Sequence, residues 1–237
     1  MRERILWIDV IRGISILAMI TFHFAFDMMY FGFAKSDLIY QPDWRLFERM
    51  IAFSFLFIAG LSLSITHEAW INWKSFIRRY GMTAICAVLI STVTYILFGN
   101  DMIRFGILHA ISISGLISLL FLKLNSLSLV LLAVAIFLIN TMMPKPLNGD
   151  YFWQWLVHTT NTPNSLDYRP IIPWITPFIL GMASHQLFKN WGLLEKGKAV
   201  THRELSFLSW LGRNSLAIYL VHQPILFASF SLFLKIS

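Results

Sequence analysis

The sequence predicts an all-α fold, a polytopic transmembrane helix bundle of about seven spans, with the N-terminus inside and the C-terminus outside. Three observations support this prediction. The 237 residues are 57% hydrophobic and only 13% charged, whereas soluble domains carry about a quarter charged residues. The apolar residues gather in seven long stretches, and none of these alternates with period 2 as a barrel strand would. We therefore expect residues 1–237 to form a single transmembrane domain.

The seven stretches are long enough for helices that cross a hydrocarbon core of about 30 Å. In chain order they run from Ile5 to Phe33, Leu46 to Thr66, Gly81 to Gly99, Phe105 to Leu122, Leu127 to Met143, Ile171 to Phe188 and Ser206 to Leu234. The first stretch follows a basic start, Met1 to Arg4, of the kind that begins a signal peptide. Because this apolar run is too long and lacks a small-residue cleavage site, we expect it to remain as the first helix.

The basic residues are divided unequally between the two sides of the membrane. With the N-terminus inside, ten fall in inner segments and six in outer segments. The inner ones are Arg2, Arg4, Lys74, Arg78, Arg79, Lys123, Lys189, Lys196, Lys198 and Arg203, and the outer ones are Lys35, Arg45, Arg104, Lys145, Arg169 and Lys235. Lys and Arg are enriched on the cytoplasmic side of membrane proteins, so this count favours the predicted orientation in a cell inner membrane.

Charge and cysteine content exclude several classes of partner. The net charge of +7 would suit nucleic acid, but the asymmetry between the two sides of the bilayer accounts for most of it. Cys86, the one cysteine, lies in an apolar run, so the chain cannot build a disulfide framework or a thiolate metal cage. Intramembrane histidines could ligate haem, but no single helix carries two of them at the spacing of stacked haems. We expect no nucleic-acid partner and no metal.

The strongest functional signal is a polar stripe along the first helix. Four ionisable residues fall within an arc of about 60° on the helical wheel: Asp9, Arg12, His23 and Asp27. Such side chains are costly inside a span and usually face a protein interior or a water-filled cavity. The Asp27 carboxylate could orient His23 as a general base; alternatively, a neighbouring helix satisfies the histidine. Asp9 and Arg12 could instead form a structural ion pair, or pair with Arg213.

Polar residues also mark the outer ends of two other predicted helices. Arg104 and His109 begin the fourth, and Asp167 and Arg169 precede the sixth. Both pairs lie on the side of the membrane where the stripe of the first helix ends. For His109, packing in the core and a role in a site are both open.

The last predicted helix has a polar face of its own. Ser215, Tyr219 and His222 lie at i, i+4 and i+7, which places them on one side of the helix. Gln223 and Pro224 follow, and the proline ring frees a backbone carbonyl one turn earlier. For His222, core packing and a role in a site are again both open.

Six segments together resemble the bacterial members of the heparan-alpha-glucosaminide N-acetyltransferase family. They are Arg4 to Ile14 with its Asp-x-x-Arg-Gly start, Phe22 to Asp27, Phe55 to Gly60, Arg104 to Ala110, Ile172 to Trp174 and Trp210 to Pro224. The resemblance covers almost the whole chain. The start and the histidine near the outer end of the first helix also look like the wider group of transmembrane acyltransferases that modify sugars.

The resemblance implies an acetyl-CoA-dependent N- or O-acetyltransferase. It would take acetyl-CoA from the cytosol and deliver the acetyl group to an acceptor on the far side of the membrane. The stripe fits this role, because Arg12 and His23 are about 16 Å apart along the helix axis, a length comparable with the pantetheine arm. Arginines suit the CoA phosphates, and the donor site would consist of Asp9, Arg12, Arg213, Asn214 and His222.

At the outer end, we expect His23 to deprotonate the acceptor and Asp27 to orient the imidazole. Arg104 or His109 would polarise the thioester carbonyl or stabilise the oxyanion, and direct transfer and an acetyl-histidine intermediate are both open. The acceptor, an amino sugar or glycan, would contact Asp167, Arg169, Tyr219 and Gln223. Animal members have their proposed catalytic histidine just after the first helix, where residues 31–46 contain none. Either His23 takes this role or the bacterial group uses the fold differently.

Two other classes of function compete. An ion-coupled transporter would also place Asp, His and Arg inside spans; inverted repeats would favour it, and the sequence shows none. A non-catalytic membrane scaffold would leave the polar stripe unexplained. A homodimer is compatible with each of these functions.

Overall fold

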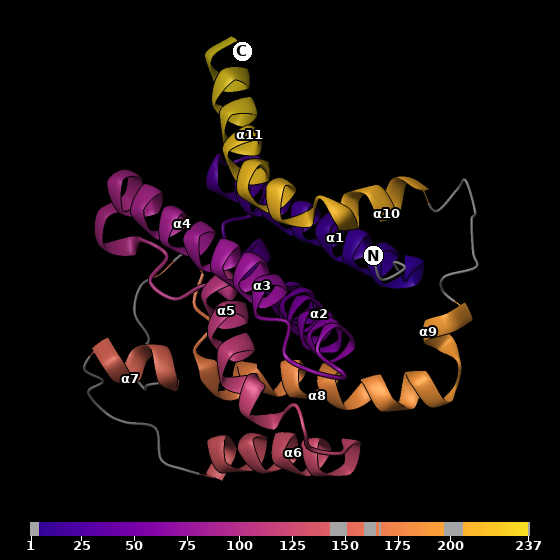
Figure 1. Ribbon diagram of the computed structural model, residues 1–237. Helices are drawn as coiled ribbons and strands as arrows, with labels where there is room; N and C mark the ends of the chain where they lie inside the picture. Colours follow the sequence, from indigo (N-terminus) through magenta and orange to yellow (C-terminus); the bar gives the residue numbers. More distant parts are fainter. Residues whose placement is uncertain (1–4, 143–150, 159–164, 166, 197–205, 237) are drawn as a thin grey trace. The chain divides into compact units, whose positions relative to one another are not determined.

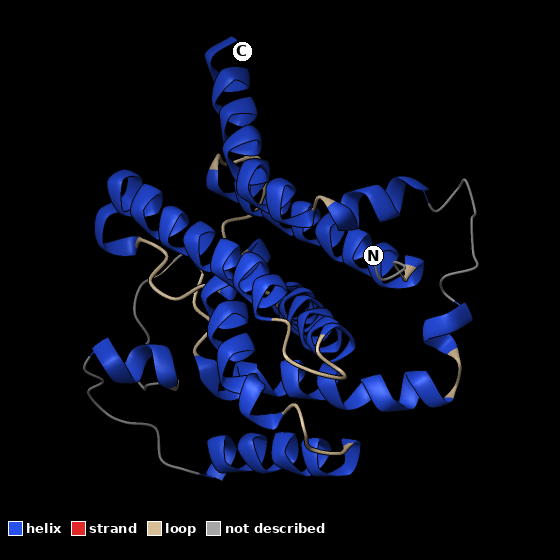
Figure 2. Ribbon diagram, in the orientation of Figure 1, coloured by secondary structure: helices blue, strands red, loops and turns tan. Residues whose placement is uncertain are grey.

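The computed structural model describes residues 5–142, 151–158, 165, 167–196 and 206–236. These residues form helices joined by turns, with two isolated β-bridges (Figures 1 and 2). The prediction of an all-α fold is confirmed for this part of the chain. Five basic residues used for the topology prediction lie outside the described residues: Arg2, Arg4, Lys145, Lys198 and Arg203.

The chain divides into two compact units, and each is described by itself. The first consists of Met1–Phe55 and Gly192–Ser237, the second of Leu56–Trp191. Helix α2, Pro42–Thr66, begins in the first unit and ends in the second. One continuous helix thus contributes to both units. That residues 1–237 form a single domain stays a prediction.

The first unit is built around helix α1. Its helices are α1 (Leu6–Tyr30), a 3₁₀ turn (Leu38–Tyr40), the first part of α2, α9 (Leu193–Lys196), α10 (Ser206–Arg213) and α11 (Ser215–Ile236). Both α10 and α11 pack against α1, as Figure 1 shows. Buried Ile16, Met19 and Ile51 form a small core between α1 and α2. This core lies on one side of α1, and the exposed apolar residues Ile14 and Leu17 lie on the other.

Helices α1 and α10 touch through two glycines. A Cβ atom on Gly13 would overlap the carbonyl oxygen of Leu208, and a Cβ atom on Gly212 would overlap the carbonyl oxygen of Asp9. Residues without a side chain allow two helix backbones to approach this closely, as in small-residue interfaces of membrane proteins. The glycine of the Asp-x-x-Arg-Gly start therefore lies at a helix crossing.

The last predicted span, Ser206 to Leu234, is wrong as a single helix. The structure divides it at Asn214 into α10 and α11. The backbone N–H and the side-chain amide of Asn214 both donate to the carbonyl oxygen of Trp210, at 3.1 and 2.8 Å. The first part of this run, Ser206–Arg213, is less apolar than the second and ends in Arg213, and it packs against α1. The span itself begins at Ser215.

Helices α1 and α11 run in the same direction. Rings near their C-terminal ends are in contact, with centroids 5.5 Å apart for Tyr30 and Phe227 and 5.5 Å apart for Phe31 and Phe230. Helix α10, which precedes α11, lies instead near the start of α1, at Gly13. If α1 and α11 both cross a membrane, they therefore begin on the same side of it, and the number of spans from α1 to α11 is odd.

The second unit is organised around α8. Its helical segments are the second part of α2, α3 (Trp73–Phe76), a π-helical segment (Ile77–Gly81), α4 (Met82–Phe98), 3₁₀ turns (Gly99–Asp101 and Leu119–Phe121), α5 (Ile107–Ser118), α6 (Ser126–Met142), α7 (Tyr151–Leu156) and α8 (Ile171–Asn190). Helix α8 packs against α5 and α6 (Figure 1), and its Phe178 and Ile179 are fully buried. This central position makes the start of α8 a fixed point for the polar network described below.

Helices α2 and α8 meet at a second glycine crossing. A Cβ atom on Gly60 would overlap the carbonyl oxygen of Phe178, and one on Gly181 would overlap that of Phe57. Near the C-terminal ends of the same two helices, Lys189 Nζ donates to Glu68 Oε1 at 2.5 Å, and His185 Nε2 lies 4.0 Å from Glu68 Oε2. Helices α2 and α8 therefore run in the same direction, as their places in an alternating sequence of spans require.

Each of the seven predicted stretches contains a helix, and five helices in the described part of the chain are long and apolar enough to span. These are Leu6–Tyr30, Pro42–Thr66, Trp73–Asp101, Ile171–Asn190 and Ser215–Ile236. The helices Ile107–Phe121 and Ser126–Met142 are shorter. Five spans and seven spans are both odd numbers, so the parallel directions of α1 and α11 are compatible with either count. The two cases differ in whether α5 and α6 cross the membrane or return to the side they entered.

Candidate functional site

Four of the five residues predicted to bind the donor, Asp9, Arg12, Arg213 and Asn214, lie near the start of α1 or at the end of α10, whereas the fifth, His222, lies within α11. Arg12 Nη1 donates to Asp9 Oδ1 at 3.0 Å in a partly buried ion pair. Arg213 is exposed, and its Nε donates to the carbonyl oxygen of Ser209 in its own helix at 3.2 Å. Gly212 lies against the carbonyl of Asp9, so the glycine crossing brings this ion pair close to the end of α10. The sequence left open whether Asp9 and Arg12 form an ion pair, and the structure shows this ion pair.

Asp27 is bound by the last helix. It is 0% exposed, and its Oδ1 accepts a hydrogen bond from Gln223 Nε2 at 2.8 Å. Asp27 Oδ2 and Gln223 Oε1 are buried and have no hydrogen-bond partner among the described residues. The sequence predicts the carboxylate as a partner for His23, and the structure adds Gln223 as its hydrogen-bond donor.

His222, one residue before Gln223, is oriented by its own helix. Its Nδ1 lies 2.7 Å from the carbonyl oxygen of Tyr219. A carbonyl oxygen can only accept, so Nδ1 carries the hydrogen and donates it. The lone pair of the neutral ring is then on Nε2, which is buried and has no hydrogen-bond partner in the part of the chain that the structure describes. His222 itself is 8% exposed.

Two imidazoles of the first unit, those of His23 and His222, lie side by side. The ring centroids of His23 and His222 are 4.7 Å apart, with an interplanar angle of 66°. Phe22 contacts His23 edge to face at 5.8 Å, and the Tyr219 ring lies 5.7 Å from that of His222. We define the histidine cluster as His23, Asp27, Tyr219, His222 and Gln223. It joins two membrane-length helices and contains both proton-accepting groups and a carboxylate.

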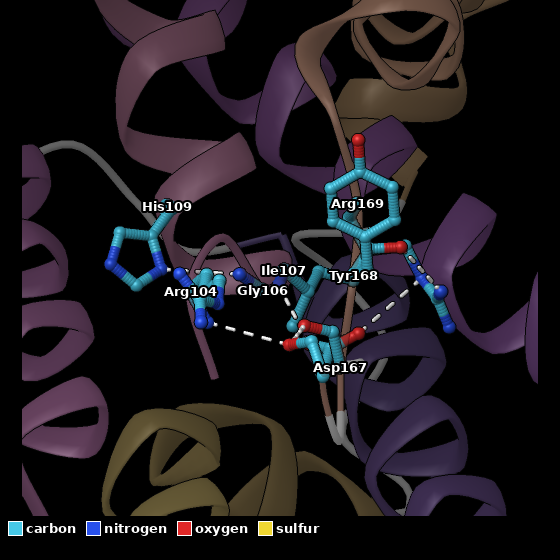
Figure 3. Close-up of polar contacts among 8 residues, drawn as sticks. Arg104, Gly106, Ile107, His109, Asp167, Tyr168 and Arg169 are labelled. Atoms are coloured by element: carbon cyan, nitrogen blue, oxygen red, sulfur yellow. Dashed lines mark hydrogen bonds and ion pairs between the residues drawn. The ribbon is translucent and has the colours of Figure 1, made fainter. Parts of the chain in front are cut away.

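A second polar network lies in the second unit, where the N-terminus of α5 meets the start of α8 (Figure 3). Asp167 Oδ2 accepts the backbone N–H of Ile107 at 2.8 Å, and Oδ1 lies 3.6 Å from Nε of Arg169. The Arg169 backbone N–H donates to the carbonyl oxygen of Phe105 at 2.8 Å. Asp167 thus caps the first turn of α5, whose N–H groups have no partner inside the helix.

His109 is bound at both ring nitrogens. Nδ1 accepts the backbone N–H of Gly106 at 3.2 Å (Figure 3), so the hydrogen of the neutral ring is on Nε2. Nε2 lies 3.4 Å from Ser91 Oγ, which in turn donates to the carbonyl oxygen of Ile103 at 2.5 Å. Both nitrogens therefore hold the connection between α4 and α5, and neither offers a lone pair to a substrate in this arrangement.

Arg104 and Arg169 contribute to the same network. Arg104 Nη2 donates to the carbonyl oxygen of Asn100 at 3.3 Å, and its backbone N–H donates to Ser165 Oγ at 3.4 Å. The Arg169 guanidinium lies 5.0 Å from the centroid of the Trp174 ring. We define the Asp167 network as Ser91, Arg104, His109, Ser165, Asp167 and Arg169. Its contacts fix the segment before α8 to the α4–α5 connection.

The predicted site residues thus fall into three groups: the donor end with Asp9, Arg12, Arg213 and Asn214 and the histidine cluster, both in the first unit, and the Asp167 network in the second unit. Sequence reasoning gave the members of the histidine cluster three different roles, whereas the structure brings them together. It grouped Arg104 and His109 with the acceptor base, whereas the structure places them in the Asp167 network. It missed Ser91 and Ser165, because a serine in an apolar or loop segment gives no signal for its distant partner. Among the described residues, no group of three or more His, Cys, Asp or Glu could hold a metal ion.

Comparisons with known proteins give one match. A family model described as heparan-alpha-glucosaminide N-acetyltransferase, catalytic, matches residues 4–224. No curated protein and no solved structure matches the chain. The matched residues include both the histidine cluster and the Asp167 network.

Proposed function

Because the chain belongs to the heparan-alpha-glucosaminide N-acetyltransferase family, we propose that it moves an acetyl group from acetyl-CoA to an amine or hydroxyl of a sugar acceptor. The family and the long apolar helices show a membrane acetyltransferase. The donor, the acceptor and their sides of the membrane are our proposal: acetyl-CoA enters from the cytosol, and the acceptor enters from the outer side of a cell inner membrane.

The histidine cluster is the observation that supports this proposal most strongly. An acyl transfer needs a base for the acceptor proton, and His23 and His222 lie with their rings 4.7 Å apart. Asp27 is fully buried beside them. A lipid-facing role does not account for two imidazoles and a carboxylate between two spanning helices, whereas proton transfer does.

The donor end of the proposal rests on the length of α1. Arg12 and His23 are about 16 Å apart along the axis, so a CoA with its phosphates near Arg12 and Arg213 would carry the thioester toward the histidine cluster. Arg213 is exposed and available for a bidentate phosphate contact. Arg12 holds Asp9 at 3.0 Å, so it would contact the donor as part of an ion pair.

The test uses the purified full chain with acetyl-CoA and two matched acceptors, glucosamine and glucose. Release of free CoA is followed with a thiol reagent, and acetylated product is identified by mass spectrometry. Acetylglucosamine formation alone indicates an amine acceptor, and acetylated glucose indicates a hydroxyl acceptor. If neither sugar is acetylated and neither raises CoA release above the rate with acetyl-CoA alone, the proposed sugar acetyltransferase activity is contradicted.

A further inference from the structure

Three polar atoms of the histidine cluster are buried without a hydrogen-bond partner among the described residues. They are Asp27 Oδ2, His222 Nε2 and Gln223 Oε1. Leaving a buried polar atom unpaired is costly, because the atom gives up its hydrogen bonds to water and gains none in return. Three such atoms on neighbouring residues indicate that this part of the unit is shaped for a polar ligand.

All three atoms are hydrogen-bond acceptors. Asp27 Oδ2 is a carboxylate oxygen, and Gln223 Oε1 is the amide oxygen left over because Nε2 donates to Asp27 Oδ1 at 2.8 Å. His222 Nε2 is an acceptor because Nδ1 carries the ring hydrogen toward the Tyr219 carbonyl at 2.7 Å. A ligand that satisfies all three must bring three hydrogens, as an amine or hydroxyl together with the neighbouring hydroxyls of a sugar does and a thioester carbonyl does not.

The His222 ring is held in this state by geometry. Its hydrogen bond to Tyr219 lies within one turn of α11, so the ring cannot turn Nε2 away without breaking that bond. Rotation is further restricted by the His23 ring at 4.7 Å and the Tyr219 ring at 5.7 Å. A base whose tautomer and direction are fixed by a second hydrogen bond has the arrangement that general base catalysis uses.

We infer that the acceptor group binds between Asp27 Oδ2, His222 Nε2 and Gln223 Oε1, and that His222 Nε2 takes its proton, while His23 donates a hydrogen bond to the acetyl carbonyl. This inference rests on the proposed function and deepens it. It gives His222 a catalytic role in place of the donor-binding role expected from the sequence.

The reaction balances with these two imidazoles. The acceptor nitrogen or oxygen forms a bond to the acetyl carbonyl carbon while its proton moves to His222 Nε2. The carbon–sulfur bond then breaks, and the proton on His222 passes to the leaving CoA sulfur. The products are the acetylated acceptor and CoA with its thiol restored, and His222 returns to its neutral form.

The experiment compares His222→Asn and His222→Gln with His23→Gln. Asparagine at position 222 keeps an N–H group near the Nδ1 position for the Tyr219 carbonyl but removes the Nε2 lone pair. We expect His222→Asn and His222→Gln to lower the rate of CoA release by about 10²- to 10⁴-fold, with acetyl-CoA affinity and melting temperature unchanged. His23→Gln keeps an N–H donor near the Nε2 position, so we expect it to retain much more activity than His222→Gln.

Two further measurements make the result independent of folding and of the choice of sugar. In His222→Ala, added imidazole should restore part of the rate, because a free base can enter the space of the lost ring. Slow hydrolysis of acetyl-CoA, with water as the acceptor, needs the same base and should fall in parallel. Ser229→Ala is the matched control on α11, since its exposed hydroxyl only donates to the carbonyl of Ile225, and it should behave as wild type.

The outcomes separate this inference from the proposed function. If wild type transfers acetyl groups but His222→Gln keeps its rate and His23→Gln loses it, His23 is the base and our assignment is overturned. If both glutamine variants keep the wild-type rate, the cluster is structural and the inference is also overturned. If wild type neither transfers nor hydrolyses acetyl-CoA, the proposed function fails and the inference falls with it.

Discussion

Gly13 of α1 and Gly212 of α10 lie against each other's helices, each in contact with a carbonyl oxygen of the opposite backbone. This reciprocal arrangement places the Asp9–Arg12 ion pair beside the end of α10. It also appears in the second unit, where Gly60 and Gly181 join α2 to α8 in the same way. In both units, two helices far apart in sequence are joined backbone to backbone.

We expect Gly13→Ala and Gly212→Ala each to lower the stability of the protein. The added methyl group must displace a backbone carbonyl, and overpacking of this kind costs about 1–3 kcal/mol. Alanine gains only about 0.5–1 kcal/mol over glycine in a helix, so the net effect is destabilising. Thermal unfolding of the purified protein in detergent measures it.

Gly81→Ala is the matched control for these variants. A Cβ atom at this helical position would meet only Ile77 Cγ2, at an ordinary 3.8 Å, so we expect an unchanged or higher melting temperature. Equal melting temperatures for all three variants would show that both positions of the crossing accept a methyl group without loss of stability, and would contradict tight packing there.

Gln223→Glu should prevent normal folding of the first unit. It would set a second carboxylate against the buried Asp27, where Gln223 Nε2 now donates at 2.8 Å. An uncompensated buried charge typically costs about 3–5 kcal/mol. The double variant Asp27→Asn with Gln223→Glu moves the charge to α11 and restores an amide-to-carboxylate hydrogen bond, so it should recover folded protein.

Size-exclusion chromatography and melting curves of the single and double variants check this prediction. Recovery in the double variant with low transfer activity would assign the charge of Asp27 a role beyond folding. A single variant as stable as wild type would mean that the two side chains separate and that the bond contributes little.

Arg213→Ala should weaken acetyl-CoA binding by about tenfold or more, because a charge-assisted phosphate bond contributes about 1.5–3 kcal/mol. The side chain is exposed, so the melting temperature should not change. Arg12→Ala should lower both affinity and stability, since Asp9 would lose the guanidinium at 3.0 Å. Calorimetric titration with acetyl-CoA distinguishes the two effects, and wild-type affinity in both variants would make these arginines purely structural.

Asp167→Ala should destabilise the start of α5, because it leaves the N–H of Ile107 without the acceptor that now lies at 2.8 Å. Loss of a helix cap costs about 0.5–2 kcal/mol. Asp167→Asn keeps an acceptor oxygen and should cost less. Asp101→Ala, an exposed residue of the same connection, serves as the control, and hydrogen exchange at Ile107 reports the local opening directly. Equal exchange in Asp167→Ala and wild type would contradict the cap.

The number of spans can be decided at Lys123, an exposed residue between α5 and α6. If both helices cross, Lys123→Cys should react with an impermeant thiol reagent from the inner side, together with Lys74→Cys. Lys35→Cys should react from the outer side in either case. Reaction of Lys123→Cys from the outer side, or from neither side, would favour five spans with α5 and α6 returning to the side they entered. Buried Cys86 gives a low background.

The sequence predicts the helices well and their partners poorly. Each apolar stretch became helical because a membrane span must satisfy its backbone hydrogen bonds internally, and this requirement is readable from composition. The break at Asn214 has a signal in the sequence, because the segment Ser206–Arg213 is less apolar than Ser215–Ile236 and ends in Arg213, but the contact of α10 with α1 leaves no local pattern. Spacing likewise suggests His23 as the neighbour of Asp27, whereas the bond to Gln223 spans 196 positions and leaves no local pattern.

In the histidine cluster and the Asp167 network, too, the sequence indicates the residues but not their partners. Tyr219, His222 and Gln223 were recognisable as a polar face from helical periodicity, but the direction of the His222 lone pair depends on one hydrogen bond to its own backbone. Asp167 and Arg169 were recognisable as charges before a helix, but the capping of α5 by Asp167 bridges 60 positions. Periodicity identifies a face, and only the folded chain shows what that face meets.

The bond between Asp27 and Gln223 also bears on how the protein is made. The ribosome completes α1 long before α11, so for most of synthesis the carboxylate of Asp27 enters the bilayer region without the amide that later binds it. An acidic side chain in a span raises the free energy of insertion, which favours a first helix that remains within the translocation machinery until the last one arrives. Chains truncated before α11 would retain this unmatched helix and be natural targets for membrane quality control.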